Sequence, residues 1–160
     1  MPHVTIEYVI MVPLMILQIL LFPLTASWLM NIWVNSRRTL ALQEAASHLG
    51  STIQQIYLSL NHTTISAGIV TQKSNVPPFI ENCPYTGNAK LSTVLDPALK
   101  SSKILKITLK LKTVGIIVAT SVILGQMVQW QESTFVSNST NAGIRAEKFT
   151  NGTISLSFGG

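Results

Sequence analysis

The chain has 160 residues, of which 47% are hydrophobic and only 11% are charged, and its formal net charge is +5. This length allows one compact domain and one extended element, and it excludes two substantial domains. A single cysteine, Cys83, excludes an intrachain disulfide, and no Cys/His spacing indicates a metal site, so we expect no cofactor apart from possible N-linked glycans.

The first predicted element is a long helix over residues 4–60. Residues 8–36 carry no charged side chain, and roughly 20 apolar residues at about 1.5 Å each are enough to cross a bilayer. The run is too long for the apolar part of a secretory signal peptide and lacks a basic start, so we expect it to stay in the mature chain. It therefore predicts an apolar span over residues 4–34.

Two prolines, Pro13 and Pro23, interrupt this span. Each removes a backbone donor and clashes with the preceding turn, leaving the carbonyl oxygens of Val9 and Ile19 without their usual partners. We predict that the helix is kinked or locally melted there. The alternative is a smooth helix whose carbonyl groups tilt outward.

Residues 35–61 form the amphipathic second part of the same helix, and residues 1–61 together form the first predicted domain. Apolar residues recur there at steps of three and four, which predicts one buried stripe that packs on a sheet. The helix is expected to end near Asn61 and His62. The stripe comprises Leu42, Ala45, Ala46, Leu49, Ile53, Ile56, Tyr57 and Leu60.

The second predicted domain, residues 62–160, is an external β-rich head. Residues 63–99 are rich in proline and turn residues, so we expect loops there, with a short strand around residues 65–70. Residues 106–112 alternate strictly between polar and apolar side chains, which predicts a half-buried strand with Ile107, Leu109 and Leu111 facing inward.

Residues 114–124 are β-branched and almost wholly apolar, but too few to cross a membrane, so they predict one buried strand. Further strands are expected at 127–130 and 134–136, and two more, 144–149 and 153–158, flank an Asn-Gly turn and predict a hairpin. The fold class is therefore α+β: a long kinked N-terminal helix followed by a small antiparallel β head.

Motifs for catalysis are nearly absent. The sequence has no Gly-rich phosphate loop, no usefully spaced carboxylate pair and no nucleophile motif, so we do not expect an enzyme. A lysine-rich stretch could attract nucleic acid or an anionic surface, but no aromatic residues interleave with it to stack on bases. We interpret it as protection of an edge strand against unwanted pairing. The lysines are Lys100, Lys103, Lys106, Lys110 and Lys112.

Residues 4–13 read VTIEYVIMVP and resemble the N-terminus of type IV pilins. The interval from Glu7 to Pro13 and the later LQEAA at 42–46 are most similar to the TadE-like branch of that superfamily. The resemblance implies a structural subunit of an extracellular filament anchored at the cell envelope, a helical homopolymer built on apolar N-terminal helices. Its partners would be other copies of itself, the membrane before assembly, a prepilin peptidase and the pilus assembly machinery.

Glu7 stands at the mouth of the apolar span, where a carboxylate is costly to bury and usually marks function. In a filament, a neighbouring N-terminal ammonium could neutralise it and fix the axial register. The alternative is a single-span membrane protein with an external β domain, in which Glu7 lies in the headgroup layer.

Three N-glycosylation motifs occur, at Asn61, Asn138 and Asn151, all at predicted helix ends or turns. Together with a pilin-like helix they favour an archaeal surface filament with a glycosylated head, although a Ser/Thr/Asn-rich surface also produces such motifs by chance. Adhesion is the expected role, and the sequence leaves motility and DNA uptake open.

Overall fold

The computed structural model describes residues 3–93 and 102–159, with side chains in the first helix described from Tyr8 onward. By its internal contacts the chain divides into two units, one ending at Arg37 and one beginning at Arg38. The first unit is wholly helical over its described residues. The second contains the remainder of the helix and all the strands.

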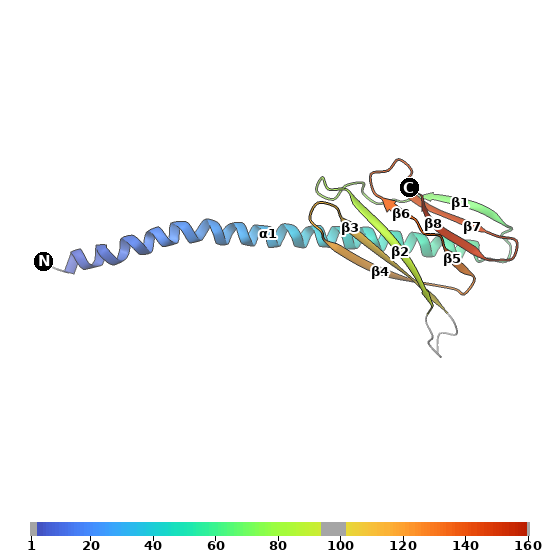
Figure 1. Ribbon diagram of the computed structural model, residues 1–160, viewed down its shortest axis with the longest axis horizontal. Coiled ribbons are helices and arrows are strands. Elements are labelled where there is room, and N and C mark those ends of the chain that lie inside the picture. Colours follow the sequence, from blue (N-terminus) through green and yellow to red (C-terminus); the bar gives the residue numbers. More distant parts are fainter. Residues whose placement is uncertain (1–2, 94–101, 160) are drawn as a thin grey trace. The chain divides into compact units, whose positions relative to one another are not determined.

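Helix α1 extends from His3 to Leu60, as predicted. The helix is continuous (Figure 1). Pro13 and Pro23 lie inside it, so the local melting expected at these prolines is not observed. A proline removes one hydrogen bond of the helical ladder, and the adjoining turns keep theirs. Leucine, isoleucine and methionine predominate around both prolines, and leucine and methionine are good helix formers.

The second half of α1 buries the predicted apolar stripe against the strands. Gly50 marks a close approach, because a Cβ added there would lie only 3.1 Å from Val122 Cγ2. The helix ends at Leu60, where Lys148 Nζ donates to the carbonyl oxygens of Leu60 at 2.6 Å and His62 at 3.0 Å. This lysine satisfies carbonyl groups that a helix terminus leaves without intrahelical partners. The buried helix residues are Leu42, Ala45, Ala46, Leu49, Ile53, Ile56 and Leu60.

The head contains two four-stranded sheets (Figure 1). One is antiparallel throughout, and the other contains one parallel pair, β5 with β8. Side chains from α1 and from both sheets form a single hydrophobic core. The α+β prediction is therefore confirmed. The first sheet has the order β4 (Ile117–Leu124), β3 (Lys103–Leu111), β2 (Tyr85–Thr93), β6 (Thr134–Val136), and the second β1 (Gly68–Lys73), β7 (Gly143–Lys148), β8 (Ile154–Gly159), β5 (Val128–Trp130).

The predictions for β3 and for the last hairpin are confirmed. Ile107, Leu109 and Leu111 are fully buried. Strands β7 and β8 pair in antiparallel fashion around the Asn-Gly turn, and Gly152 adopts the positive φ of 83° that this turn requires.

The prediction of loops over residues 63–99 was wrong for β2. This strand pairs with β3 along its whole length and places Tyr85, Gly87, Ala89 and Leu91 toward the core. Two of these inward residues are small, so the alternation of apolar and polar residues is weak in the sequence. Gly87 must be small, because an added Cβ would lie 2.5 Å from Leu109 Cδ2. Strand β1 also lies three residues later than expected.

Two further interpretations need correction. Strand β4 is only half buried: it lies at a sheet edge, and its Ile117 and Ile123 are exposed. Strand β3, which carries Lys103, Lys106 and Lys110, lies between β2 and β4. These three lysines therefore cannot protect a sheet edge. Lys112 follows the end of β3, and Lys100 lies outside the described residues.

Candidate assembly surface

The first candidate surface is the apolar part of α1, which we call the span and define as residues 8–33. Every residue of the span is exposed, and large apolar side chains such as Phe22, 77% exposed, occupy all faces of the helix. By length and hydropathy this is the one helix in the described part of the chain that could cross a membrane. Such a surface requires lipid or other apolar helices around it.

Polar side chains inside the span are few. The hydroxyl group of Thr25 donates within its own helix to the carbonyl oxygens of Leu21 at 3.1 Å and Phe22 at 2.9 Å, so it is satisfied without a partner chain. Gln18 is exposed and is the only amide side chain between Tyr8 and Met30. An amide in apolar surroundings favours a hydrogen bond to a neighbouring helix. Gln18 was not predicted from the sequence as a functional residue. A single amide in a long apolar run was the pattern that could have identified it.

The span ends in an aromatic and basic segment. The guanidinium of Arg37 lies 4.8 Å from the ring centroid of Trp33, one helical turn earlier. A cation over an indole face is stabilising, and aromatic rings followed by basic residues are typical of the bilayer interface. This geometry is compatible with association of the span with a membrane.

Arg38, the next residue, connects α1 to a tight turn of the head. Its Nε lies 2.7 Å from Glu81 Oε2. Glu81 and Asn82 both have positive φ, 46° and 63°, and Ile80 and Cys83 exchange backbone hydrogen bonds around them. Positive φ at both central residues is the geometry of a two-residue type I′ turn, which is unusual for a glutamate.

Partly buried hydrogen bonds hold the segment before this turn. Tyr85 Oη donates to the Pro77 carbonyl oxygen at 2.7 Å, and Ser137 Oγ donates to that of Pro78 at 2.7 Å. Ser137 Oγ also accepts from the Tyr85 backbone N–H at 3.0 Å. Burial of the Tyr85 ring raises the pKa of its phenol to about 12. The phenol therefore remains a hydrogen-bond donor at neutral pH.

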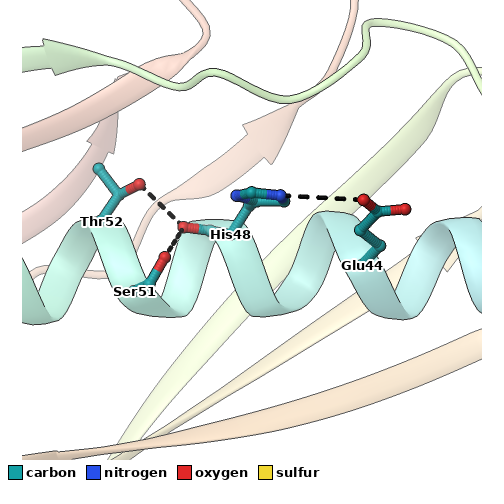
Figure 2. Close-up of polar contacts among 4 residues, drawn as sticks. All are labelled: Glu44, His48, Ser51 and Thr52. Atoms are coloured by element: carbon teal, nitrogen blue, oxygen red, sulfur yellow. Dashed lines mark hydrogen bonds and ion pairs between the residues drawn. The ribbon is translucent and has the colours of Figure 1, made fainter.

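The solvent-facing side of the second half of α1 is polar (Figure 2). His48 Nε2 lies 4.0 Å from Glu44 Oε1, and the hydroxyl groups of Ser51 and Thr52 both donate to the His48 carbonyl oxygen, at 2.9 and 2.8 Å. Hydroxyl groups that bond back to an earlier carbonyl commonly bend a helix slightly. This face presents hydroxyl, imidazole and carboxylate groups outside the hydrophobic core.

The site residues predicted from the sequence are dispersed. Glu7 belongs to α1, but its side chain lies outside the described ones. The three asparagines of the glycosylation motifs, Asn61, Asn138 and Asn151, are exposed and lie in turns. The Oδ1 of Asn151 accepts a hydrogen bond from the Thr153 backbone N–H at 3.0 Å. The side-chain nitrogen of Asn151, the atom that carries an N-linked glycan, therefore points away from that contact.

Within residues 3–93 and 102–159, no group of three His, Cys, Asp or Glu side chains is placed to hold a metal ion. Comparison of the chain with models of known protein families, with curated proteins and with solved structures found no match.

Proposed function

We propose that this chain is a structural subunit, a pilin, of an extracellular type IV pilus-like filament that serves adhesion or another surface interaction. One observation carries the proposal: α1 exposes apolar side chains on every face of the span and continues unbroken into a half whose inner stripe is buried in the head. The same helix can therefore serve as a filament core element and as part of a folded outer domain. This role needs no catalytic residues, and we do not propose an enzyme.

The physical basis of the proposal is that the exposed apolar surface of the span must be covered by other apolar groups. Before assembly, lipid chains would surround it; in the filament, the spans of neighbouring copies would replace the lipid. Because both environments are apolar, close packing and interhelical hydrogen bonds would drive the association. Gln18 is an exposed amide that could supply such a bond.

In this proposal Glu7 pairs with the N-terminal ammonium of a neighbouring copy, which neutralises the carboxylate and sets the axial register. A prepilin peptidase and a pilus assembly machinery would process and export the chain. Glycans at the exposed Asn61, Asn138 and Asn151 would cover the outer surface of the head, as expected for an archaeal surface filament.

A second candidate function is that of a single-span membrane protein with an external β domain. The stacking of Arg37 on Trp33 favours it, because this pair fits a helix that remains at a bilayer interface. A DNA-uptake pilus subunit would have the same construction as an adhesion subunit and would differ in its cargo.

Electron microscopy of material sheared from cells, with mass spectrometric identification of the subunit, separates the two. We expect filaments that contain this chain. Recovery of the chain only from detergent-extracted membranes would contradict the filament proposal and support the single-span alternative.

A further inference from the structure

A groove lies on the outer face of the β4-β3-β2-β6 sheet, the face away from the hydrophobic core, where it is lined by residues of β3 and β2 and of the segment that leads into β6. Its volume is about 560 Å³, within the range of about 300–1,000 Å³ that ligand sites occupy. We call it the lysine groove. The residues that line it are Asn88, Ala89, Lys90, Lys106, Thr108, Glu132, Ser133 and Thr134.

Two lysines stand directly opposite each other in this groove. Lys90 of β2 and Lys106 of β3 are register partners in the antiparallel pair, so their Cβ atoms are about 4.5–5.5 Å apart. Both side chains are exposed. Like charges in this position destabilise a sheet, and an anion bound between the two lysines would relieve their repulsion.

The described part of the head supplies no such anion in an ion pair. The ion pairs there join Arg38 to Glu81 and His48 to Glu44, and neither pair includes Lys90 or Lys106. Since β3 is a central strand, edge protection does not explain the lysines either. The two lysines exceed the single carboxylate of the groove, Glu132, by one charge, so a net positive charge is available to an external ligand.

The rest of the lining is neutral except for Glu132, and it is polar except for Ala89. Asn88 faces Thr108 on one side and Thr134 on the other, which gives one amide and two hydroxyl groups. Glu132 adds a single exposed carboxylate. The two lysines of the groove can bind acidic groups of a ligand. The amide, the hydroxyl groups and the carboxylate, which only accepts hydrogen bonds, can bind hydroxyl groups of the same ligand.

We propose that the lysine groove binds an acidic polysaccharide, whose sulfate or carboxylate groups contact Lys90 and Lys106 while its hydroxyl groups bond to Asn88, Thr108 and Glu132. An acidic sugar chain carries both kinds of group on each short repeat. Nucleic acid fits less well, because none of the described residues that line the groove is aromatic and the groove therefore offers no platform for base stacking. A second copy of this chain fits poorly as well, because its six acidic residues are scattered and form no acidic segment.

This inference is independent of filament formation, because it concerns one face of one head. Its test uses the full-length chain in detergent micelles, with heparin as the acidic polysaccharide, dextran as a neutral one, and a duplex DNA. Binding is measured at about 50 mM salt, where exposed charges are weakly screened. The variant is Lys90→Gln with Lys106→Gln. The matched control is Lys73→Gln with Lys112→Gln, which removes the same charge from two exposed lysines outside the groove.

We expect heparin to bind more tightly than dextran and DNA, and the groove variant to lose about tenfold in affinity while the control loses less than about twofold. The thermal midpoint of the groove variant should not fall, because the substitutions relieve repulsion between facing lysines. Three results would overturn the proposal. These are no preference for heparin over dextran, equal losses in the two variants, and tighter binding of DNA with a loss confined to the groove variant.

Discussion

Arg38 and Glu81 are separated by 43 residues in the chain, and their side chains meet at 2.7 Å. The arginine is the first residue of the unit that contains the strands, and the glutamate occupies a turn position with φ of 46°. A non-glycine residue held at positive φ costs free energy, and the surrounding structure must compensate for it. The ion pair supplies part of that compensation and joins the turn to the helix.

The first prediction tests this pair. Arg38→Gln and Glu81→Gln should each lower the free energy of unfolding of the head by about 0.2–1 kcal/mol, since both side chains are partly exposed and water screens the pair. Denaturant unfolding in micelles, as a double-mutant cycle, measures the coupling, and added salt should reduce it. A coupling of zero at low salt would show that the contact does not stabilise the turn.

The second prediction concerns Gly50, where α1 lies close to β4. Gly50→Leu should destabilise the head by about 1–3 kcal/mol, because the side chain would enter the space occupied by Val122. Gln54→Leu introduces the same side chain on the exposed face of the same helix and should change stability by less than about 0.5 kcal/mol. Equal effects of the two substitutions in chemical denaturation would contradict the close packing.

The third prediction concerns the buried phenol of Tyr85. Its pKa is raised to about 12 in the folded state, against about 10 in an unfolded chain, so folding keeps the proton bound. The contribution of Tyr85 to stability should be complete below about pH 10 and should be lost as the pH rises toward 12. Tyrosinate absorbance during alkaline titration should reveal one late phenol that Tyr85→Phe removes and Tyr57→Phe leaves in place. If the late absorbance change persisted in Tyr85→Phe, the phenol that causes it would belong to another residue.

The fourth prediction concerns Glu7. Glu7→Ala removes a charge at the mouth of the span, so membrane insertion should be unchanged, whereas filament yield should fall because the proposed register pair is lost. Glu44→Ala removes a carboxylate from the exposed face of α1 and provides the matched control. Insertion is followed by membrane fractionation and yield by quantifying sheared filaments. A normal yield from Glu7→Ala would show that the carboxylate is incidental to assembly.

The fifth prediction is that one or more of Asn61, Asn138 and Asn151 carry a glycan, since all three are exposed in turns. Glycopeptide mass spectrometry of native material identifies the occupied positions. Asn→Gln at an occupied position should remove the added mass and increase proteolysis of the head. Three unmodified peptides would remove this argument for an archaeal source and would leave the filament proposal intact.

Local patterns in the sequence were sufficient for several parts of this fold. The long helix, its buried stripe around Leu49 and Ile53, the strand with Ile107 and Leu109, and the hairpin at Gly152 were all predicted and are all present. Each depends on periodicity or turn chemistry among residues adjacent in the chain. The amino-acid sequence by itself also determined that residues 8–36 carry no charge, and the proposed function depends on that property.

Only the tertiary structure decided how the strands are ordered. Strand β2 was overlooked because its inward Gly87 and Ala89 are small. The lack of a side chain at Gly87 is explained only by Leu109 of β3 and Phe135 of β6, which lie beside it. Because β3 is a central strand, its Lys106 lies on a sheet face beside Lys90, in the lysine groove, and not at a sheet edge. Strand pairing is a contact between residues far apart in the chain, so no local pattern specifies which strands become neighbours.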